Sequence, residues 1–312
     1  MKNSPGCPGA NSGPAGRPSA PADSPTSSTL DVMVVASHRD FAITRQCLWN
    51  LAAYVPYRRS VYLVTDQPRR GEDLIGSLGL TGFSVVPDSE VLSERESLLP
   101  GWYKQQIIKL RADHVLGGNI LCVLSGDTVL ARLLPRSELV APNGRPYLYV
   151  NRYCYPSPHL AYERQRVRAV AQLLGVAPTI SLDLGDFISD LFCFERDVLA
   201  LAVARLEQQF GQPWTRILEG RGTSEADQAG FGEYTLYAVT ALELLPERPP
   251  VRVAQETHVL QLHSRHSFEA ARFQAPIVHI VDKGISVDEV VERAALYGKD
   301  MRPAKNGDIS DS

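Results

Sequence analysis

The segment Asn119-Ile-Leu-Cys-Val-Leu-Ser-Gly-Asp-Thr-Val-Leu130 contains the stretch of sequence that decides the fold. Residues 120–124 form an uninterrupted apolar run, a pattern typical of a strand buried on both faces of a parallel sheet. Ligands of open α/β sheets bind beyond the carboxyl ends of the strands. We therefore expect Ser125, Gly126 and Asp127 to lie at a binding site, although Ser-Gly-Asp is also common in ordinary turns.

The composition limits the classes of protein that this chain can represent. It has 312 residues, of which 44% are hydrophobic and 21% charged, so it can bury the core of one large or two smaller domains. A net charge of -3 gives no reason to expect nucleic acid or an anionic membrane as a partner. No stretch reaches the ~18 apolar residues of a membrane span. The five cysteines lack CxxC spacing, and their odd number favours a reduced, cytoplasmic chain.

The two ends of the chain differ from its middle in composition. Residues 1–29 are rich in Pro, Gly, Ser and Ala and predict a disordered N-terminal tail. They lack the apolar centre of a secretory signal, so export by that route is not expected. Residues 299–312 are polar and predict a disordered C-terminal tail. Residues 30–298 are expected to form one folded domain.

Short apolar strands alternate with helical segments along the folded part. Residues 32–36, 61–66 and 82–88 read as three strands, and their spacing favours βαβ units and a parallel sheet. The first strand leads through Ser37 into a helix without the G-x-G-x-x-G of a dinucleotide-binding turn, which argues against a nicotinamide or flavin enzyme. Asp66 ends the second strand, where it could accept a hydrogen bond from a ribose or base, but Thr-Asp-Gln-Pro is equally a turn.

A basic amphipathic helix is expected over residues 104–116, ahead of the Ser-Gly-Asp strand. Its apolar residues recur at helical spacing, and Gly117-Gly118 ends it. Its polar face includes Lys104, Gln105, Lys109 and Arg111. Such a face is usually solvated. Because this helix leads directly into the strand, Lys109 or Gln106 is placed to reach a phosphate or sugar bound beyond the strand.

Three patterns follow one another in order along the chain. They are Gly-Trp-Tyr-Lys-Gln-Gln-Ile-Ile-Lys-Leu (101–110) with Leu-Ser-Gly-Asp-Thr-Val-Leu (124–130), then Phe-Ile-Ser-Asp-Leu-Phe-Cys-Phe-Glu-Arg-Asp (187–197), then Gly-Glu-Tyr-Thr-Leu-Tyr (232–237). Together they resemble a bacterial family of originally uncharacterised proteins allied to GT-A glycosyltransferases, from about residue 31 to about residue 266. The resemblance implies a GT-A-like (Rossmann-like) α/β domain with a central, mostly parallel sheet flanked by helices. It also implies a nucleotide-sugar donor and a sugar-containing small-molecule or glycan acceptor.

In such proteins the strand usually ends in Asp-x-Asp, whose carboxylates hold Mn²⁺ or Mg²⁺ against the donor phosphates. The leaving diphosphate gains negative charge, which a cation stabilises. Here Ser125 replaces the first acid and Asp127 remains, and one carboxylate binds a hard cation less well than two. Three interpretations stay open: a weakly held cation completed by donor phosphates and His263, charge neutralisation by Lys and Arg, or a lost activity.

The resemblance and the local chemistry together give a set of candidate site residues. His263 is a metal candidate by analogy with a late histidine of GT-A enzymes, and Arg265 suits a diphosphate oxygen through its planar fork. Glu233 heads a predicted helix, where the helix dipole already favours a carboxylate. Its functional interpretation is a general base or a ligand of the acceptor hydroxyl, with Asp190 as the rival. The predicted donor contacts are Ser37, Asp66, Gln106, Lys109, Ser125, Gly126, Asp127 and Arg265; the metal ligands are Asp127 and His263.

Two other classes of function remain alternatives. A non-catalytic nucleotide- or sugar-binding relative would account for Ser125. A nucleotidyltransferase would share a similar nucleotide-binding half-sheet, but it would release pyrophosphate and not a nucleoside diphosphate.

Overall fold

The fold was obtained as a computed structural model, which describes residues 29–151, 157–179, 181–184, 187, 191–219, 221–222, 224–254, 259–262, 277–280, 286, 288–290 and 292–293. The predicted C-terminal tail over 299–312, and all of the predicted N-terminal tail over 1–29 except Thr29, lie outside these residues. The central sheet has five strands in the order β3-β2-β1-β4-β7. Their bounds are Leu30–Val35 (β1), Arg58–Thr65 (β2), Phe83–Pro87 (β3), Ile120–Ser125 (β4) and Leu191–Glu195 (β7). The first four run parallel, and β7 is antiparallel to β4.

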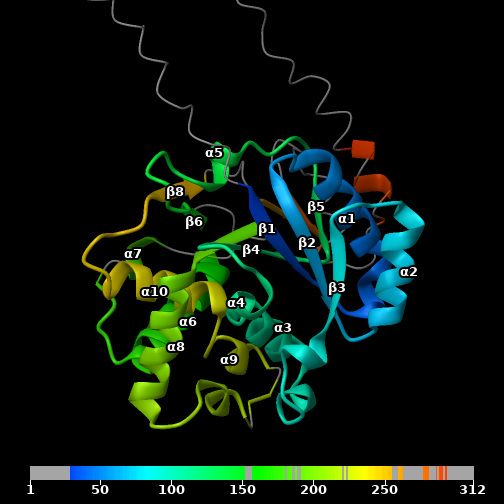
Figure 1. Ribbon diagram of the computed structural model, residues 1–312. Coiled ribbons are helices and arrows are strands. Elements are labelled where there is room, and N and C mark those ends of the chain that lie inside the picture. Colours follow the sequence, from blue (N-terminus) through cyan, green and yellow to red (C-terminus); the bar gives the residue numbers. More distant parts are fainter. Residues whose placement is uncertain are drawn as a thin grey trace, which may run out of the picture.

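Helices cover both faces of this sheet, as Figure 1 shows. One face carries α1 (Phe41–Tyr54) and α2 (Pro68–Leu78). The other face carries α3 (Gly101–Leu110), α6 (Ser157–Leu174), α8 (Arg196–Phe210) and α10 (Glu233–Glu243). This arrangement confirms the predicted α/β class with a central, mostly parallel sheet flanked by helices.

The alternation of side chains along β1 divides the core into two clusters. Val32 and Val34 pack with the α1 side, whereas Met33 and Val35 pack with the α3 side. Successive side chains of a strand point to opposite faces of the sheet. A strand that is buried on both faces needs a continuous apolar run, which is the pattern that the sequence shows for β1 and β4.

Shorter elements complete the described part of the chain. Two small sheets have the orders β5-β10-β9 and β6-β8. Their strands are Thr128–Leu130 (β5), Leu148–Asn151 (β6), Val251–Ala254 (β8), Val259–Leu262 (β9) and Ile277–Ile280 (β10). The short helices are η1 (His38–Asp40), η2 (Asp88–Glu90), η3 (Glu96–Leu98), α4 (Ala112–Val115), α5 (Arg136–Leu139), α7 (Ser181–Leu184), η4 (Trp214–Leu218) and α9 (Glu225–Gln228). Within the described residues, no helix has the length and apolar character needed to cross a bilayer.

The boundaries of two helices bear on the sequence-based expectations. The helix predicted over 104–116 begins earlier, at Gly101, and is interrupted at Arg111, whose backbone leaves the helical conformation. The pattern over 187–197 spans two elements, because β7 ends at Glu195, which occupies the N-cap position of α8, and Asp197 lies in the first turn of that helix. The residues at these two boundaries make ion pairs, Arg111 with Glu96 and Glu195 with Arg145.

The segment between β3 and α3 is fixed to α3 by a two-pronged ion pair. The Arg111 guanidinium donates to both carboxylate oxygens of Glu96 over 2.6 and 2.8 Å and also to the Val91 carbonyl. Burial of Glu96 opposes ionisation, but the bonds from Arg111 and from the Ser93 amide outweigh it and lower the pKa of Glu96 to about 2. This contact holds the chain that leads into α3, which forms one wall of the site described below.

We expect this pair to make the protein acid-sensitive over a defined range. Because the pKa of Glu96 is about 2 in the folded state and ordinarily 4.5, its contribution is complete above about pH 4.5 and is lost as the pH falls towards 2. Urea denaturation at a series of pH values should show this decline, and Glu96→Gln should flatten it. An unchanged pH profile in Glu96→Gln would contradict the assignment.

Candidate functional site

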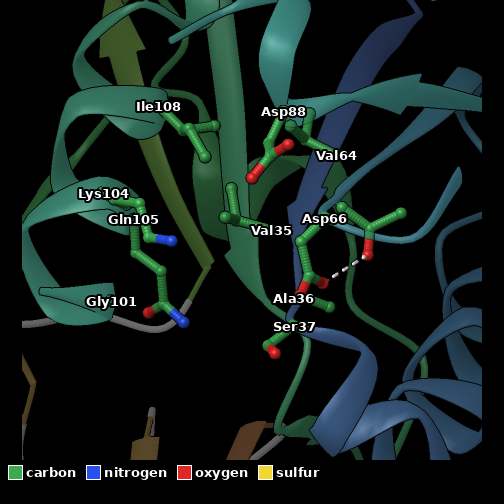
Figure 2. A pocket seen from close by; sticks show the side chains of 11 residues that line it. Val35, Ala36, Ser37, Val64, Asp66, Asp88, Gly101, Lys104, Gln105 and Ile108 are labelled. Atoms are coloured by element: carbon green, nitrogen blue, oxygen red, sulfur yellow. Dashed lines mark hydrogen bonds between the residues drawn. The ribbon is translucent and has the colours of Figure 1, made fainter. Parts of the chain in front are cut away.

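A pocket opens at the carboxyl ends of the parallel strands, between those ends and α3. Its space is about 410 Å³, counting the open solvent at its mouth. Figure 2 shows its walls. They are formed by Val35, Ala36, Ser37, Val64, Thr65, Asp66, Asp88, Gly101, Lys104, Gln105 and Ile108.

The pocket lies beside the point where the order of the strands reverses. The chain proceeds from β1 to β2 and β3 on one side of β1, and β4 returns to its other side. Connections on either side of such a point diverge and leave a crevice, where open α/β sheets bind their ligands. The position of the pocket therefore follows from topology, and the side chains at the strand ends determine what it can hold.

The Ser-Gly-Asp turn adjoins the β1 wall of this pocket. Ser125, at the end of β4, is in register with Val35, and the Gly126 amide donates to the Val35 carbonyl over 2.9 Å. A Cβ atom on Gly126 would lie 2.5 Å from the Cβ of Ala36. Glycine is needed here because the turn approaches β1 more closely than a side chain would allow. Asp127 itself is not among the residues that line the pocket, and its carboxylate lies close enough to Cys47 of α1 to help raise the pKa of that thiol.

Asp66 is held in place by the residue that follows Ser37. The backbone amide of His38 donates to one carboxylate oxygen of Asp66 over 2.8 Å, and the Nδ1 atom of His38 lies 2.6 Å from the other. Partial burial raises the pKa of Asp66, but the bonds from His38 outweigh it, and the net shift is downward. Asp66 therefore stays ionised and presents its acceptors at the end of β2.

Two charged side chains of opposite sign face each other across the pocket. Asp88 follows β3, and Lys104 lies in the first part of α3 (Figure 2). Within the described part of the chain, neither side chain makes an ion pair. Gln105 adds an amide on the Lys104 side. The pocket thus has an acidic wall at the strand ends and a basic, polar wall on α3.

Three of the predicted site residues form a second, buried cluster between α3 and α10. The Lys109 ammonium lies 2.9 Å from a Glu233 carboxylate oxygen, and both side chains are less than 10% exposed. The Glu233 amide donates to the side-chain oxygen of Gln106 over 3.0 Å, and the ammonium lies over the Tyr234 ring. Burial lowers the pKa of Lys109, but the Glu233 carboxylate outweighs it, and the net shift is upward.

The structure thus separates the candidate residues into groups. Ser37 and Asp66 line the pocket, and the Ser125–Asp127 turn adjoins it. Gln106, Lys109 and Glu233 contact one another in the buried cluster. Asp190, His263 and Arg265 lie outside the described residues. Contact of any of these residues with a donor or acceptor stays a prediction.

Neither of the two opposed charges of the pocket, Asp88 and Lys104, was predicted as a site residue. Asp88 ends the third strand in the same way that Asp66 ends the second, so the same rule applied to every strand would have found it. Lys104 was assigned only to a polar helix face, because helical spacing does not tell which cation of a helix faces a cavity.

The resemblance implies a divalent cation at the Ser-Gly-Asp turn, so the metal ligands that this turn offers are of interest. Among the residues that the structure describes, no three His, Cys, Asp or Glu side chains are grouped so as to hold an ion. The turn offers one carboxylate, Asp127, and one hydroxyl, Ser125. Mg²⁺ is commonly bound by one or two carboxylates together with water and substrate phosphates. A cation at this turn would therefore need most of its ligands from water and a bound diphosphate, and it stays a prediction.

Several solved structures are similar to this fold. The galactosyltransferase LgtC, in complex with donor and acceptor sugar analogs, has a TM-score of 0.47 and 11% identity, over 86% of this chain and 94% of that one. Mouse xyloside xylosyltransferase 1 has a TM-score of 0.47 and 12% identity, over 83% and 100%. The bifunctional glycosyltransferase WbbM has a TM-score of 0.49 and 11% identity, over 88% and 51%. At these identities the similarity concerns the fold alone.

Comparison with family models gives one match. A model described as a family of unknown function (DUF6492) matches residues 62–269, which is well over half of the chain and includes β4, the Ser-Gly-Asp turn and α10. No curated protein matches the chain significantly.

Proposed function

Because the chain belongs to the family of unknown function DUF6492, its activity has to be argued from its site, and we propose that it is a glycosyltransferase. In this proposal it moves a sugar from a nucleotide-sugar donor to a small-molecule or glycan acceptor. The observation that carries the proposal is the pocket at the carboxyl ends of β1, β2 and β3, which adjoins a turn with the single acid Asp127. The resemblance of the three sequence segments to proteins allied to GT-A glycosyltransferases supports it.

The donor would lie across the strand ends, with its nucleoside in the pocket. Asp66, fixed by His38, offers acceptors for hydroxyl or N–H groups of the nucleoside, and Val35 and Ile108 supply apolar contact. The diphosphate would extend towards Ser125 and Asp127. A divalent cation shared with Asp127 would, when bound, neutralise charge on the diphosphate.

The transfer itself exchanges one bond at the anomeric carbon of the sugar. The acceptor hydroxyl oxygen forms a bond to this carbon while the bond to the diphosphate oxygen breaks, and the nucleoside diphosphate leaves with that electron pair. The hydroxyl proton has to pass to a base. Of the two predicted candidates, Glu233 is buried and bound to Lys109, which favours a structural role in joining α10 to α3. Asp190, the other predicted candidate, lies outside the described residues and stays a prediction for this role.

The proposed function predicts specific stabilisation by a nucleotide sugar. Since a ligand that binds only the folded state raises the melting temperature, one of UDP-, GDP- or dTDP-sugars should raise it in a thermal-shift screen with and without Mn²⁺. Asp127→Asn should remove the part of the shift that depends on Mn²⁺, because it removes the carboxylate of the turn. Asp73→Asn, on the exposed surface of α2, makes the same change of charge and serves as the control.

Product analysis separates this proposal from the alternatives. Incubation with the stabilising donor and candidate acceptors should release a nucleoside diphosphate. Release of pyrophosphate would identify a nucleotidyltransferase, and binding without turnover of any donor would identify a non-catalytic relative. If no nucleotide sugar changes the melting temperature, the proposed function is wrong.

A further inference from the structure

The opposed charges of the pocket allow an inference about how a nucleotide lies in it, which rests on the proposed function. The acidic side chains occupy one end of the pocket. Asp66 follows β2 and Asp88 follows β3, and both strands lie on the side of β1 that is away from β4. Neighbouring strands are about 4.8 Å apart, so the end of β3 is roughly 10 Å from the end of β1.

A diphosphate is disfavoured at this acidic end. Two carboxylates and a diphosphate repel one another, and like charges placed together in a binding site act strongly against binding. Carboxylates accept hydrogen bonds from the hydroxyl groups of a ribose or the N–H groups of a base. The described residues place no hydrogen-bond donor on the Asp88 carboxylate, so its oxygens are open to such groups.

The opposite end of the pocket carries the cation. α3 packs over β1, where Ile107 and Ile108 contact the cluster that contains Met33 and Val35. Lys104 extends from the same helix into the pocket lining beside Val35 (Figure 2). Val35 is also in register with Ser125. A ligand that runs from the nucleoside end towards the Ser-Gly-Asp turn therefore passes Lys104.

Lys109, which was predicted as a donor contact, is paired with Glu233 and not with the pocket. Its ammonium is buried against Glu233, 2.9 Å away, on the α10 side of α3. Lys104 lies five residues earlier and forms no ion pair with any described residue. It is therefore the cation of α3 that is available to a ligand in this pocket.

We propose that Lys104 binds the diphosphate of the nucleotide and Asp88 its nucleoside, so that the ligand lies across the pocket from β3 towards β4. A complete Asp-x-Asp motif would bind a metal ion, whose positive charge faces the diphosphate. Here the first acid is missing, and Lys104 supplies part of that positive charge. A flexible ammonium is well suited to this contact, because it can follow phosphate oxygens without fixed geometry.

Two variants that should affect different ligands test this orientation. Isothermal titration would measure the affinity of uridine and UDP, and of guanosine and GDP, for the full chain in EDTA and in Mn²⁺. Lys104→Met should weaken the diphosphate by about 10- to 100-fold, the range of a charge-assisted hydrogen bond, and leave the nucleoside unchanged. Asp88→Asn should weaken nucleoside and diphosphate by the same factor. Lys104→Arg should retain most of the diphosphate affinity.

A control variant and the binding of the wild-type chain separate a failure of this orientation from a failure of the proposed function. Arg164→Met, on the exposed face of α6, removes the same charge away from the pocket and should change neither affinity. If UDP or GDP binds but Lys104→Met preserves the ratio of diphosphate to nucleoside affinity, the orientation is wrong and the proposed function stands. The same conclusion follows if the Lys104→Met effect disappears in EDTA. If neither nucleotide binds the wild-type chain, both proposals fail.

Discussion

Replacing Lys109 with methionine is expected to lower the free energy of unfolding by about 3–5 kcal/mol, because it leaves a buried carboxylate without its cation. The Lys109 ammonium and the Glu233 carboxylate are 2.9 Å apart and nearly inaccessible to solvent. The same ammonium lies over the ring of Tyr234, 4.8 Å from its centroid, so the substitution also removes a cation–π contact. Urea denaturation followed by circular dichroism measures the change through the midpoint at constant slope.

A double substitution and a neighbouring lysine provide the controls. Lys109→Met combined with Glu233→Met should recover much of the lost stability, since a buried ion pair and an apolar pair of similar volume are often close in free energy. Lys104→Met should change the stability by no more than about 0.5 kcal/mol, because Lys104 is partly exposed and forms no ion pair with the described residues. A loss below about 1 kcal/mol for Lys109→Met would contradict the buried pair and return Lys109 to the candidate donor contacts.

Replacing Gly126 with alanine is expected to destabilise the fold by about 1–3 kcal/mol and to weaken donor binding. The new methyl group would lie 2.5 Å from the Cβ of Ala36 and 2.8 Å from the hydroxyl oxygen of Thr44. Neither neighbour is the far end of a flexible side chain, so the backbone of the turn has to move. Because Asp127 is the next residue, its carboxylate moves as well.

Stability and ligand binding are measured separately for this variant. Urea denaturation gives the loss of stability, and the melting-temperature shift on adding the donor gives the loss of binding. Gly76→Ala, in α2, is the control, because no atom lies within 4 Å of its new methyl group and alanine favours a helix. If Gly126→Ala is as stable as the wild type, the close approach of the turn to β1 is refuted.

The path of the central sheet was predictable from local patterns. The apolar runs over 32–36, 61–66, 82–88 and 120–124 correspond to β1, β2, β3 and β4, with differences of a few residues at their ends. This agreement has a simple cause. β1 and most of β4 are buried, and a strand covered on both faces requires a continuous apolar run, which is visible in a window of a few residues. The edge strand β3 is only partly buried, and its apolar run reflects packing against β2 and α2.

The edge strand β7 was less visible. Its sequence, Leu191 to Glu195, was recognised through a family pattern and not as a strand, and its antiparallel pairing with β4 was not anticipated. The register places Cys122 opposite Cys193, 71 residues apart in the chain. Parallel and antiparallel edge strands have the same apolar pattern, so the direction depends on how the intervening helices return the chain.

The sequence by itself determined that this protein has an α/β sheet with Asp66 and Asp127 after two of its strands, because strands with a buried apolar run can be recognised locally. Only the tertiary structure decided which polar residues of α3 face the pocket and which are buried. Lys109 pairs with Glu233 across 124 residues, and Lys104 is left to the pocket. Such a pairing depends on how α10 packs against α3, and no local pattern in either helix records the position of the other.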